Sequence, residues 1–196
     1  FDNDEFLGHH TPPITYLTWS ILALWRARQH YIRFHCLACQ ASIVLYCSNH
    51  KTGNPGKGLR KMVHSLFKNA NAKKVLIGVV HLPPLPGSPG WAGDMGWVLD
   101  RAQEEASILE QGGASGIIVE NFGDVPFRIG PVEPDTVAAI TLAVARVKQS
   151  ANLPVGVNML RNDARSALAV AGATGADFIR VNVHYGVMAA EEGMVQ

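Results

Sequence analysis

Acidic residues are missing from a long stretch of the sequence, because no Asp or Glu lies between Glu5 and Asp94. Cysteine is also scarce: Cys47 is the last of three, and the first methionine is Met62. An odd number of cysteines does not support a disulfide framework, so a reducing compartment is the simpler expectation. The longest apolar run, residues 14–25, covers about 12 residues, whereas a membrane-spanning helix needs roughly 20. We therefore expect no transmembrane helix and a soluble, cytoplasmic protein.

The charged residues divide the chain into two parts. Residues 1–73 contain nine Lys and Arg against three Asp and Glu, while residues 74–196 contain eight against thirteen. The basic residues of the first part are scattered along the sequence, so we expect no nucleic-acid binding. We interpret residues 1–73 as a basic N-terminal extension unrelated to the folded unit that follows.

Two origins for this extension stay open. An internal start at Met62 would make residues 1–61 upstream sequence that the functional protein does not need, and their removal would then leave the fold unchanged. The alternative is a leader for mitochondria or another organelle, since such leaders are poor in acidic residues and contain Arg.

Three cysteines and one histidine have a spacing that zinc sites also use. Cys36, Cys39, Cys47 and His50 form the pattern C-x2-C-x7-C-x2-H, which offers three thiolates and one imidazole. Residues 40–46 between them are mostly apolar and lack the glycines and charges that are typical of zinc loops. The sequence therefore predicts no metal site here.

From Lys74 onward, short apolar runs alternate with amphipathic segments, which predicts strands alternating with helices. Asp94 and Asp163 directly precede two of the amphipathic segments and are expected to cap those helices. This order and its short connections predict an α/β fold with a parallel sheet and right-handed crossovers. The expected strands are residues 75–82, 115–121, 154–160 and 177–183.

Polar residues gather where these strands end: His81, Glu120, Asn121, Asn158, Arg180, Asn182 and His184. The carboxyl ends of the strands form the active face of a β/α barrel, so this pattern favours a barrel over an open sheet. Strand alternation directs Arg180 inward, where Glu120 from another strand reaches the same layer. Since a buried Arg is rarely unpaired, we expect a Glu120–Arg180 ion pair, with direct contact to a substrate as the alternative.

His81 is the candidate general acid or base, because an imidazole titrates near neutral pH, and a structural role is the alternative. Glu120 is the second candidate catalytic residue, as a base or as the acceptor of a ligand hydroxyl. Asp163 is expected to be a helix cap rather than a metal ligand. No cofactor follows from these residues. The residues expected to bind substrate are Asn121, Asn158, Arg161, Arg180 and Asn182.

Four sequence blocks in the second part of the chain, in this order, resemble the signature blocks of the BtpA family. They are GVVHLPPLPGSP at 78–89, GIIVENFGDVPF at 116–127, PVGVNMLRND at 154–163 and GADFIRVNV at 175–183. The resemblance implies a TIM barrel, (β/α)8, of the ribulose-phosphate-binding type, of which residues 74–196 would supply about four βα units.

The resemblance also leaves three possibilities for what the chain does. Cyanobacterial members suggest biogenesis or stabilisation of photosystem I, with that membrane protein complex as the partner. Other members resemble enzymes of sugar metabolism, which implies a small phosphorylated sugar or nucleoside as the ligand. The third possibility is an incomplete gene product without independent activity, whose half barrel would associate with itself through the unpaired edges of its first and fourth strands.

The zinc interpretation gives the first testable prediction. Since the loop chemistry of a zinc site is missing, metal analysis after dialysis should find far less than one equivalent of zinc. Stoichiometric zinc that disappears in the Cys39→Ser variant would contradict this.

Overall fold

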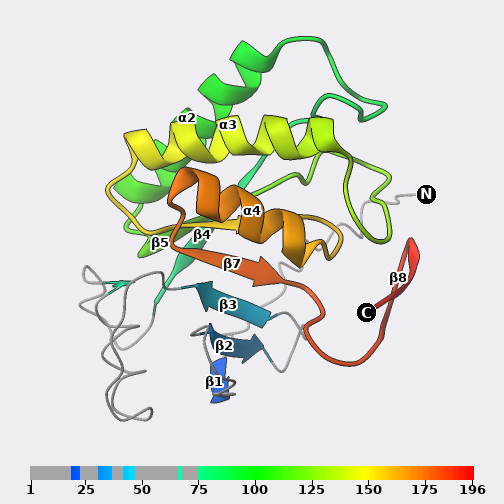
Figure 1. The fold of residues 1–196 in the computed structure, drawn as a ribbon. Helices are drawn as coiled ribbons and strands as arrows, with labels where there is room; N and C mark the ends of the chain where they lie inside the picture. Colours follow the sequence, from blue (N-terminus) through cyan, green and yellow to red (C-terminus); the bar gives the residue numbers. More distant parts are fainter. Residues whose placement is uncertain (1–18, 23–30, 37–41, 47–65, 68–74) are drawn as a thin grey trace, which may run out of the picture.

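The computed structural model describes residues 19–22, 31–36, 42–46, 66–67 and 75–196 (Figure 1). Its centre is a run of parallel strands, each lying within one of the ranges that the sequence predicted. Their ends differ from the prediction by a few residues, because the flanking residues belong to the loops. These strands are β4 (Ile77–His81), β5 (Gly116–Glu120), β6 (Val155–Asn158) and β7 (Phe178–Val181).

The connections between these strands are the helices α2 (Met95–Gln111), α3 (Pro134–Ser150) and α4 (Ala164–Thr174). Both expected caps are present. A side-chain oxygen of Asp94 accepts the Trp97 N–H at 3.0 Å, and one of Asp163 accepts the Ser166 N–H at 2.9 Å. Gly175, with φ of 70°, ends α4 in the left-handed conformation that glycine adopts without strain. None of the helices that the structure describes has both the length and the apolar composition to cross a membrane.

The parallel strands follow one another in the order β4-β5-β6-β7, and α2, α3 and α4 lie on the same side of them (Figure 1). When each right-handed crossover adds the next strand on the same side of the previous one, all the connecting helices lie on one face of the sheet. A doubly wound sheet instead reverses its strand order and carries helices on both faces. The part of the chain from β4 to β7 is therefore an α/β structure compatible with part of a barrel.

The main hydrophobic core lies between these strands and the helices. Alternate strand residues point towards the helices, because successive side chains of a strand face opposite sides. Burying one Val or Ile completely contributes about 1.5–3 kcal/mol, so this layer is the main source of stability. The fully buried strand residues on this face include Val80, Ile117, Val119, Val155, Val157 and Ile179.

The opposite face of the sheet is packed closely at the amino ends of the strands. Phe178 lies edge-on to Phe67, with ring centroids 5.9 Å apart. Gly156 makes room for Phe178, because a Cβ at this glycine would lie 2.3 Å from a ring carbon. Gly116 makes room for Phe67 in the same way. Two glycines are thus needed for the close approach of aromatic rings to the backbone.

Three further strands extend the sheet on the other side of β7. They are β1 (Trp19–Leu22), β2 (Tyr31–Cys36) and β3 (Ser42–Tyr46), and β3 pairs antiparallel with β7. The expectation that the fourth parallel strand leaves a free edge is therefore wrong. No regular alternation in this segment indicated the pairing. Of the four residues with the spacing of a zinc site, Cys39, Cys47 and His50 lie outside the described residues, so the structure does not test the prediction of no metal site.

A short hairpin follows β7 and was not predicted from the sequence. It consists of β8 (Met188–Ala190) and β9 (Gly193–Val195), and Figure 1 shows it apart from the helices. Strands of three residues are too short to show the alternation by which strands are recognised in a sequence.

The contact between Gly156 and Phe178 gives the second prediction. Gly156→Ala should lower the free energy of unfolding by about 1–3 kcal/mol, because the added methyl group overpacks the ring. Gly172→Ala is the matched control, since an added Cβ there meets nothing within 4 Å, and we expect it to be neutral or slightly stabilising. Urea unfolding of both variants measures the difference, and equal stabilities would contradict the packing.

Candidate functional site

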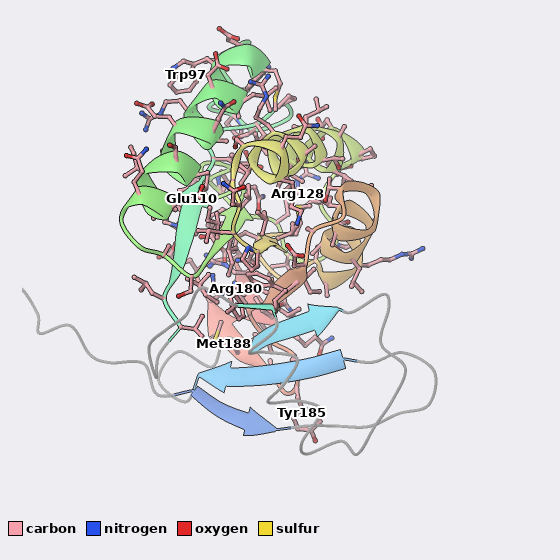
Figure 2. All side chains as sticks on the ribbon, turned by 90° about the vertical axis from the view of Figure 1, so that its left-hand side faces the viewer. Trp97, Glu110, Arg128, Arg180, Tyr185 and Met188 are labelled. Carbon is pink, nitrogen blue, oxygen red and sulfur yellow. The ribbon has the colours of Figure 1, made fainter. Side chains whose placement is uncertain are left out.

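Four polar residues form one row across the carboxyl ends of the parallel strands. His81 stands opposite Glu120, Glu120 opposite Asn158, and Asn158 opposite Arg180. Their immediate neighbours along the strands face the helices, so the row lies on the other face of the sheet. Figure 2 shows Arg180 between the helices and strand β3. The strand register thus brings together residues that are far apart in the sequence.

The Glu120 carboxylate is the centre of this row. One oxygen lies 2.9 Å from His81 Nε2. The other accepts the Asn158 amide at 2.7 Å and the Arg180 Nη1 at 3.1 Å. The Glu120 side chain is only 5% exposed, against 28% for Arg180 and 50% for His81. The expected Glu120–Arg180 ion pair is therefore present, and the carboxylate joins a cation to an imidazole that solvent can reach.

The contact with Glu120 determines which nitrogen of His81 is available. A neutral imidazole carries one N–H and one lone pair, and the nitrogen beside a carboxylate is the one that donates. Nε2 is the ring nitrogen that lies within ion-pair distance of Glu120, so Nδ1 is the nitrogen left for another partner. The ring also stacks on Phe122, with centroids 4.3 Å apart and planes 23° apart. His81 is thus held by two contacts.

Asn121 lies next to the row but has both ends of its amide engaged by the protein. Its side-chain oxygen accepts the Leu160 N–H at 2.8 Å, and its nitrogen donates to Asp124 at 3.1 Å. Asp124 also accepts the Leu85 N–H at 2.7 Å. Burial raises the pKa of this Asp124 carboxyl. Asn121 and Asp124 therefore join the loops that follow β4, β5 and β6.

Arg161 lies in the loop after β6, outside the row. Its guanidinium donates to both oxygens of Glu192, at 3.1 and 2.8 Å, and lies 4.6 Å from the centre of the Phe127 ring. The Arg161 hydrogen bond holds the pKa of Glu192 below its usual value. Glu192 thus already engages the Nε and one terminal nitrogen of this guanidinium.

Asn182 and Asp163 also contact these loops. Asn182 donates to the Arg161 main-chain oxygen at 2.9 Å. Asp163, besides capping α4, accepts the Val132 N–H at 2.9 Å. Burial acts to raise the pKa of Asp163, but its hydrogen bonds from Ser166 and Val132 outweigh burial and lower it. Among the described residues no three His, Cys, Asp or Glu side chains form a group that could hold a metal ion.

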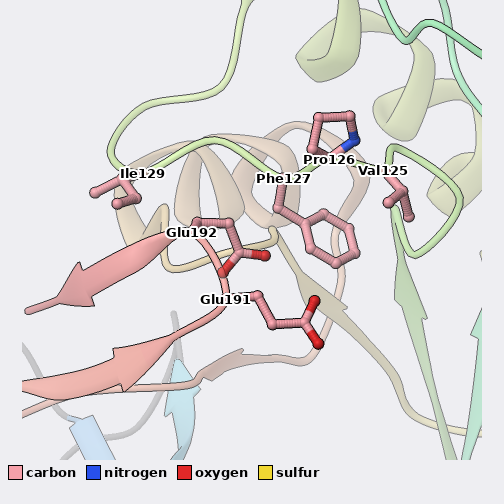
Figure 3. Close-up of a pocket in the computed structure, with 6 residues that line it drawn as sticks. All are labelled: Val125, Pro126, Phe127, Ile129, Glu191 and Glu192. Carbon is pink, nitrogen blue, oxygen red and sulfur yellow. The ribbon is translucent and has the colours of Figure 1, made fainter.

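A pocket of about 430 Å³ is linked to the row through two rings, because Phe127 in its lining lies 6.1 Å from Phe122, which stacks on His81. Figure 3 shows the Phe127 ring and the carboxylates of Glu191 and Glu192 turned towards one another across it. The row itself holds the His81 imidazole and the buried carboxylate, so we locate the candidate site at the row and regard the pocket as adjoining it. The pocket is lined by Val125, Pro126, Phe127, Ile129, Glu191 and Glu192.

Sequence reasoning missed three side chains around the site. Phe122 and Phe127 lie in the block that follows the second strand, and their aromatic character next to Glu120 was the available signal. Glu192 offered no such signal, because its role depends on the hairpin that brings it to Arg161.

The sequence is similar to that of several known proteins. The sequence profile of the BtpA family matches residues 72–196. The photosystem I biogenesis protein BtpA of Synechocystis is 51% identical over 131 residues, which are 67% of this chain and 46% of that protein. An uncharacterised protein of Pyrococcus horikoshii is 47% identical over 123 residues, 63% of this chain and 47% of the relative. An uncharacterised mitochondrial protein of Caenorhabditis elegans is 34% identical over 142 residues, 70% of this chain and 51% of the relative.

The chain thus spans about half the length of the curated relatives that it matches. No solved structure shows a significant match.

The ion pair gives the third prediction. Arg180→Met should lower the free energy of unfolding by about 3 kcal/mol, because it leaves a buried carboxylate without its cation. Glu120→Gln should cost less, about 1 kcal/mol, since Arg180 is partly exposed and water can solvate it.

Denaturant unfolding of the double variant should recover much of the summed loss. Arg165→Met, which changes an exposed Arg of α4, is the control and should lie within about 0.5 kcal/mol of the parent. Strictly additive losses at Glu120 and Arg180 would show that the two side chains are not coupled.

Proposed function

Because this chain belongs to the BtpA family, over residues 72–196, we propose that its strand-end row is a small-molecule site with acid–base chemistry. The observation that carries this proposal is the buried Glu120 carboxylate, which contacts both the partly exposed His81 and Arg180. A row that served packing alone would not need a half-exposed imidazole beside a buried carboxylate.

His81 is the proposed general base and acid. Its Nδ1 accepts a proton from a ligand hydroxyl or carbon acid, and the resulting imidazolium returns the proton later in the same cycle. Glu120 is a positioning residue: it keeps the N–H on Nε2, and its negative charge stabilises the imidazolium when it forms. Phe122 limits rotation of the ring through its stacking contact.

Arg180 is the proposed anion-binding residue. A guanidinium has five N–H donors, and one terminal nitrogen of Arg180 is directed at Glu120. The remaining donors suit a carboxylate or phosphate, which a guanidinium binds with two parallel hydrogen bonds. This supports a phosphorylated sugar or nucleoside as the ligand class. Asn158 and Asn182 complete the proposed contacts, while Asn121 and Arg161 position the surrounding loops.

A TIM barrel of the ribulose-phosphate-binding type is the proposed complete fold. Consecutive strand order with helices on one side supports it, and such barrels hold their ligands at the carboxyl ends of the strands. Because this chain spans about half of its relatives, the reaction is proposed for a complete family member.

Photosystem assembly is the second candidate function. The name of the Synechocystis relative suggests it, and one structural feature favours a protein partner. Three apolar side chains in the loop after β5 are about half exposed: Phe122 at 48%, Val125 at 59% and Ile129 at 51%. Exposed apolar groups of this kind occur where proteins bind one another. In this case the row would stabilise the fold and a membrane protein complex would contact the loop.

The fourth prediction tests the small-molecule site. Titration with ribose 5-phosphate should shift the imidazole signals of His81 in nitrogen NMR spectra and should saturate. Before ligand is added, the spectra should show the Nε2–H tautomer. Arg180→Met should weaken binding at least tenfold, since a charge-assisted pair contributes about 1.5–3 kcal/mol.

Arg165→Met is the matched control, because this exposed Arg lies on α4, and it should leave the titration unchanged. If ribose 5-phosphate and glycerol 3-phosphate both leave the His81 signals unchanged, the small-molecule site is contradicted and the assembly function gains support.

A further inference from the structure

Two asparagines near the row have the same unusual hydrogen-bonding state. The amide nitrogen of Asn158 donates to Glu120, and that of Asn182 donates to the Arg161 main chain. Both residues are almost completely buried, with exposures of 1% and 6%. Neither side-chain oxygen has a hydrogen-bond partner among the described residues. Each residue thus presents a buried acceptor.

The orientation of Asn158 follows from its neighbour. A carboxylate only accepts hydrogen bonds when it is ionised, so the amide nitrogen of Asn158 must face Glu120. Rotating the amide would bring two oxygens together and give up the contact of 2.7 Å. The Oδ1 atom of Asn158 therefore stays free, and buried polar atoms in native proteins nearly always have a partner. That partner must be a donor, either O–H or N–H.

The position of this oxygen indicates which donor it suits. Asn158 pairs in register with Arg180 on the next strand, and adjacent strands lie about 4.8 Å apart. A ligand ammonium at Asn158 would stand close to the Arg180 cation, while the nearest carboxylate, Glu120, is already paired with that cation. A hydroxyl is neutral and can donate without this repulsion. An anionic group on the same ligand can then reach the guanidinium one strand away.

We infer that the row selects a small organic anion that carries a hydroxyl group two or three bonds from its charged group. Asn158 Oδ1 accepts the hydroxyl, Arg180 binds the carboxylate or phosphate, and the His81 imidazole lies at the other end of the row. Asn158 is then a specificity-determining residue. This inference rests on the proposed small-molecule site and adds the chemical class of its ligand.

Matched pairs of anions with and without the hydroxyl test the inference on the full 196-residue chain. Lactate is compared with propionate, and glycerol 3-phosphate with propyl phosphate, by calorimetry and by His81 NMR signals. In the preferred pair the hydroxylated anion should bind at least about fivefold more tightly, as one net hydrogen bond implies. The two pairs also show whether the site prefers a carboxylate or a phosphate.

Asn158→Leu should reduce the affinity ratio within the preferred pair to about one, since it removes the acceptor. Asn152→Leu is the matched control, because Asn152 is an exposed Asn between α3 and β6, and the ratio should stay at its parent value. If Asn158→Leu does not fold, the affinities of the two anions in each pair, measured on the parent chain, still test the inference.

Three results would overturn the inference. They are equal affinities within both pairs, no saturable binding of either hydroxylated anion, and a ratio that persists in folded Asn158→Leu. Tighter binding of alanine than of lactate would also overturn it, in favour of an ammonium donor. Equal affinities accompanied by saturating His81 shifts would reject the hydroxyl selection and leave the acid–base site intact, so the two proposals fail separately.

Discussion

Burial of the Glu120 carboxylate is the constraint on which the candidate site depends. An ionised carboxylate is costly to remove from water unless it is paired and hydrogen-bonded. Its polar partners come from three other strands, since His81 lies on β4, Asn158 on β6 and Arg180 on β7. A shift of one residue in any of these strands would turn its side chain towards the helices and leave the carboxylate short of a partner. The contacts of Glu120 with the other three residues therefore stabilise the strand register that brings the four together.

The surrounding loops hold this arrangement through side chains that bond to backbone groups. Asp163 joins the start of α4 to the loop before α3, and Asn121 and Asp124 join the loops after β4, β5 and β6. Rigid strands and bonded loops are what a binding site needs to keep its polar groups in place. The helix-facing core supplies the stability that offsets the cost of a polar row. The pair of Arg161 and Glu192 attaches the β8–β9 hairpin next to the site.

Most of the α/β unit could be predicted from the sequence, because its signals are local. Apolar runs indicated the four parallel strands, Asp94 and Asp163 indicated helix starts, and alternation along the fourth strand predicted that Arg180 would meet Glu120. Other contacts between distant segments were not predictable. Such contacts depend on which loops and sheet edges meet in space. Examples are the partners of Asn121 and Arg161, the contact between Phe67 and Phe178, and the pairing of β3 with β7.

A crystal structure of a family member that retains these four residues would test the central claim most directly, at a resolution that defines side-chain hydrogen bonds. We expect the carboxylate equivalent to Glu120 to lie on the face of the sheet away from the helices, within hydrogen-bonding distance of the equivalents of His81, Asn158 and Arg180. A carboxylate that faces the helices, or that lies apart from both the imidazole and the guanidinium, would contradict the account.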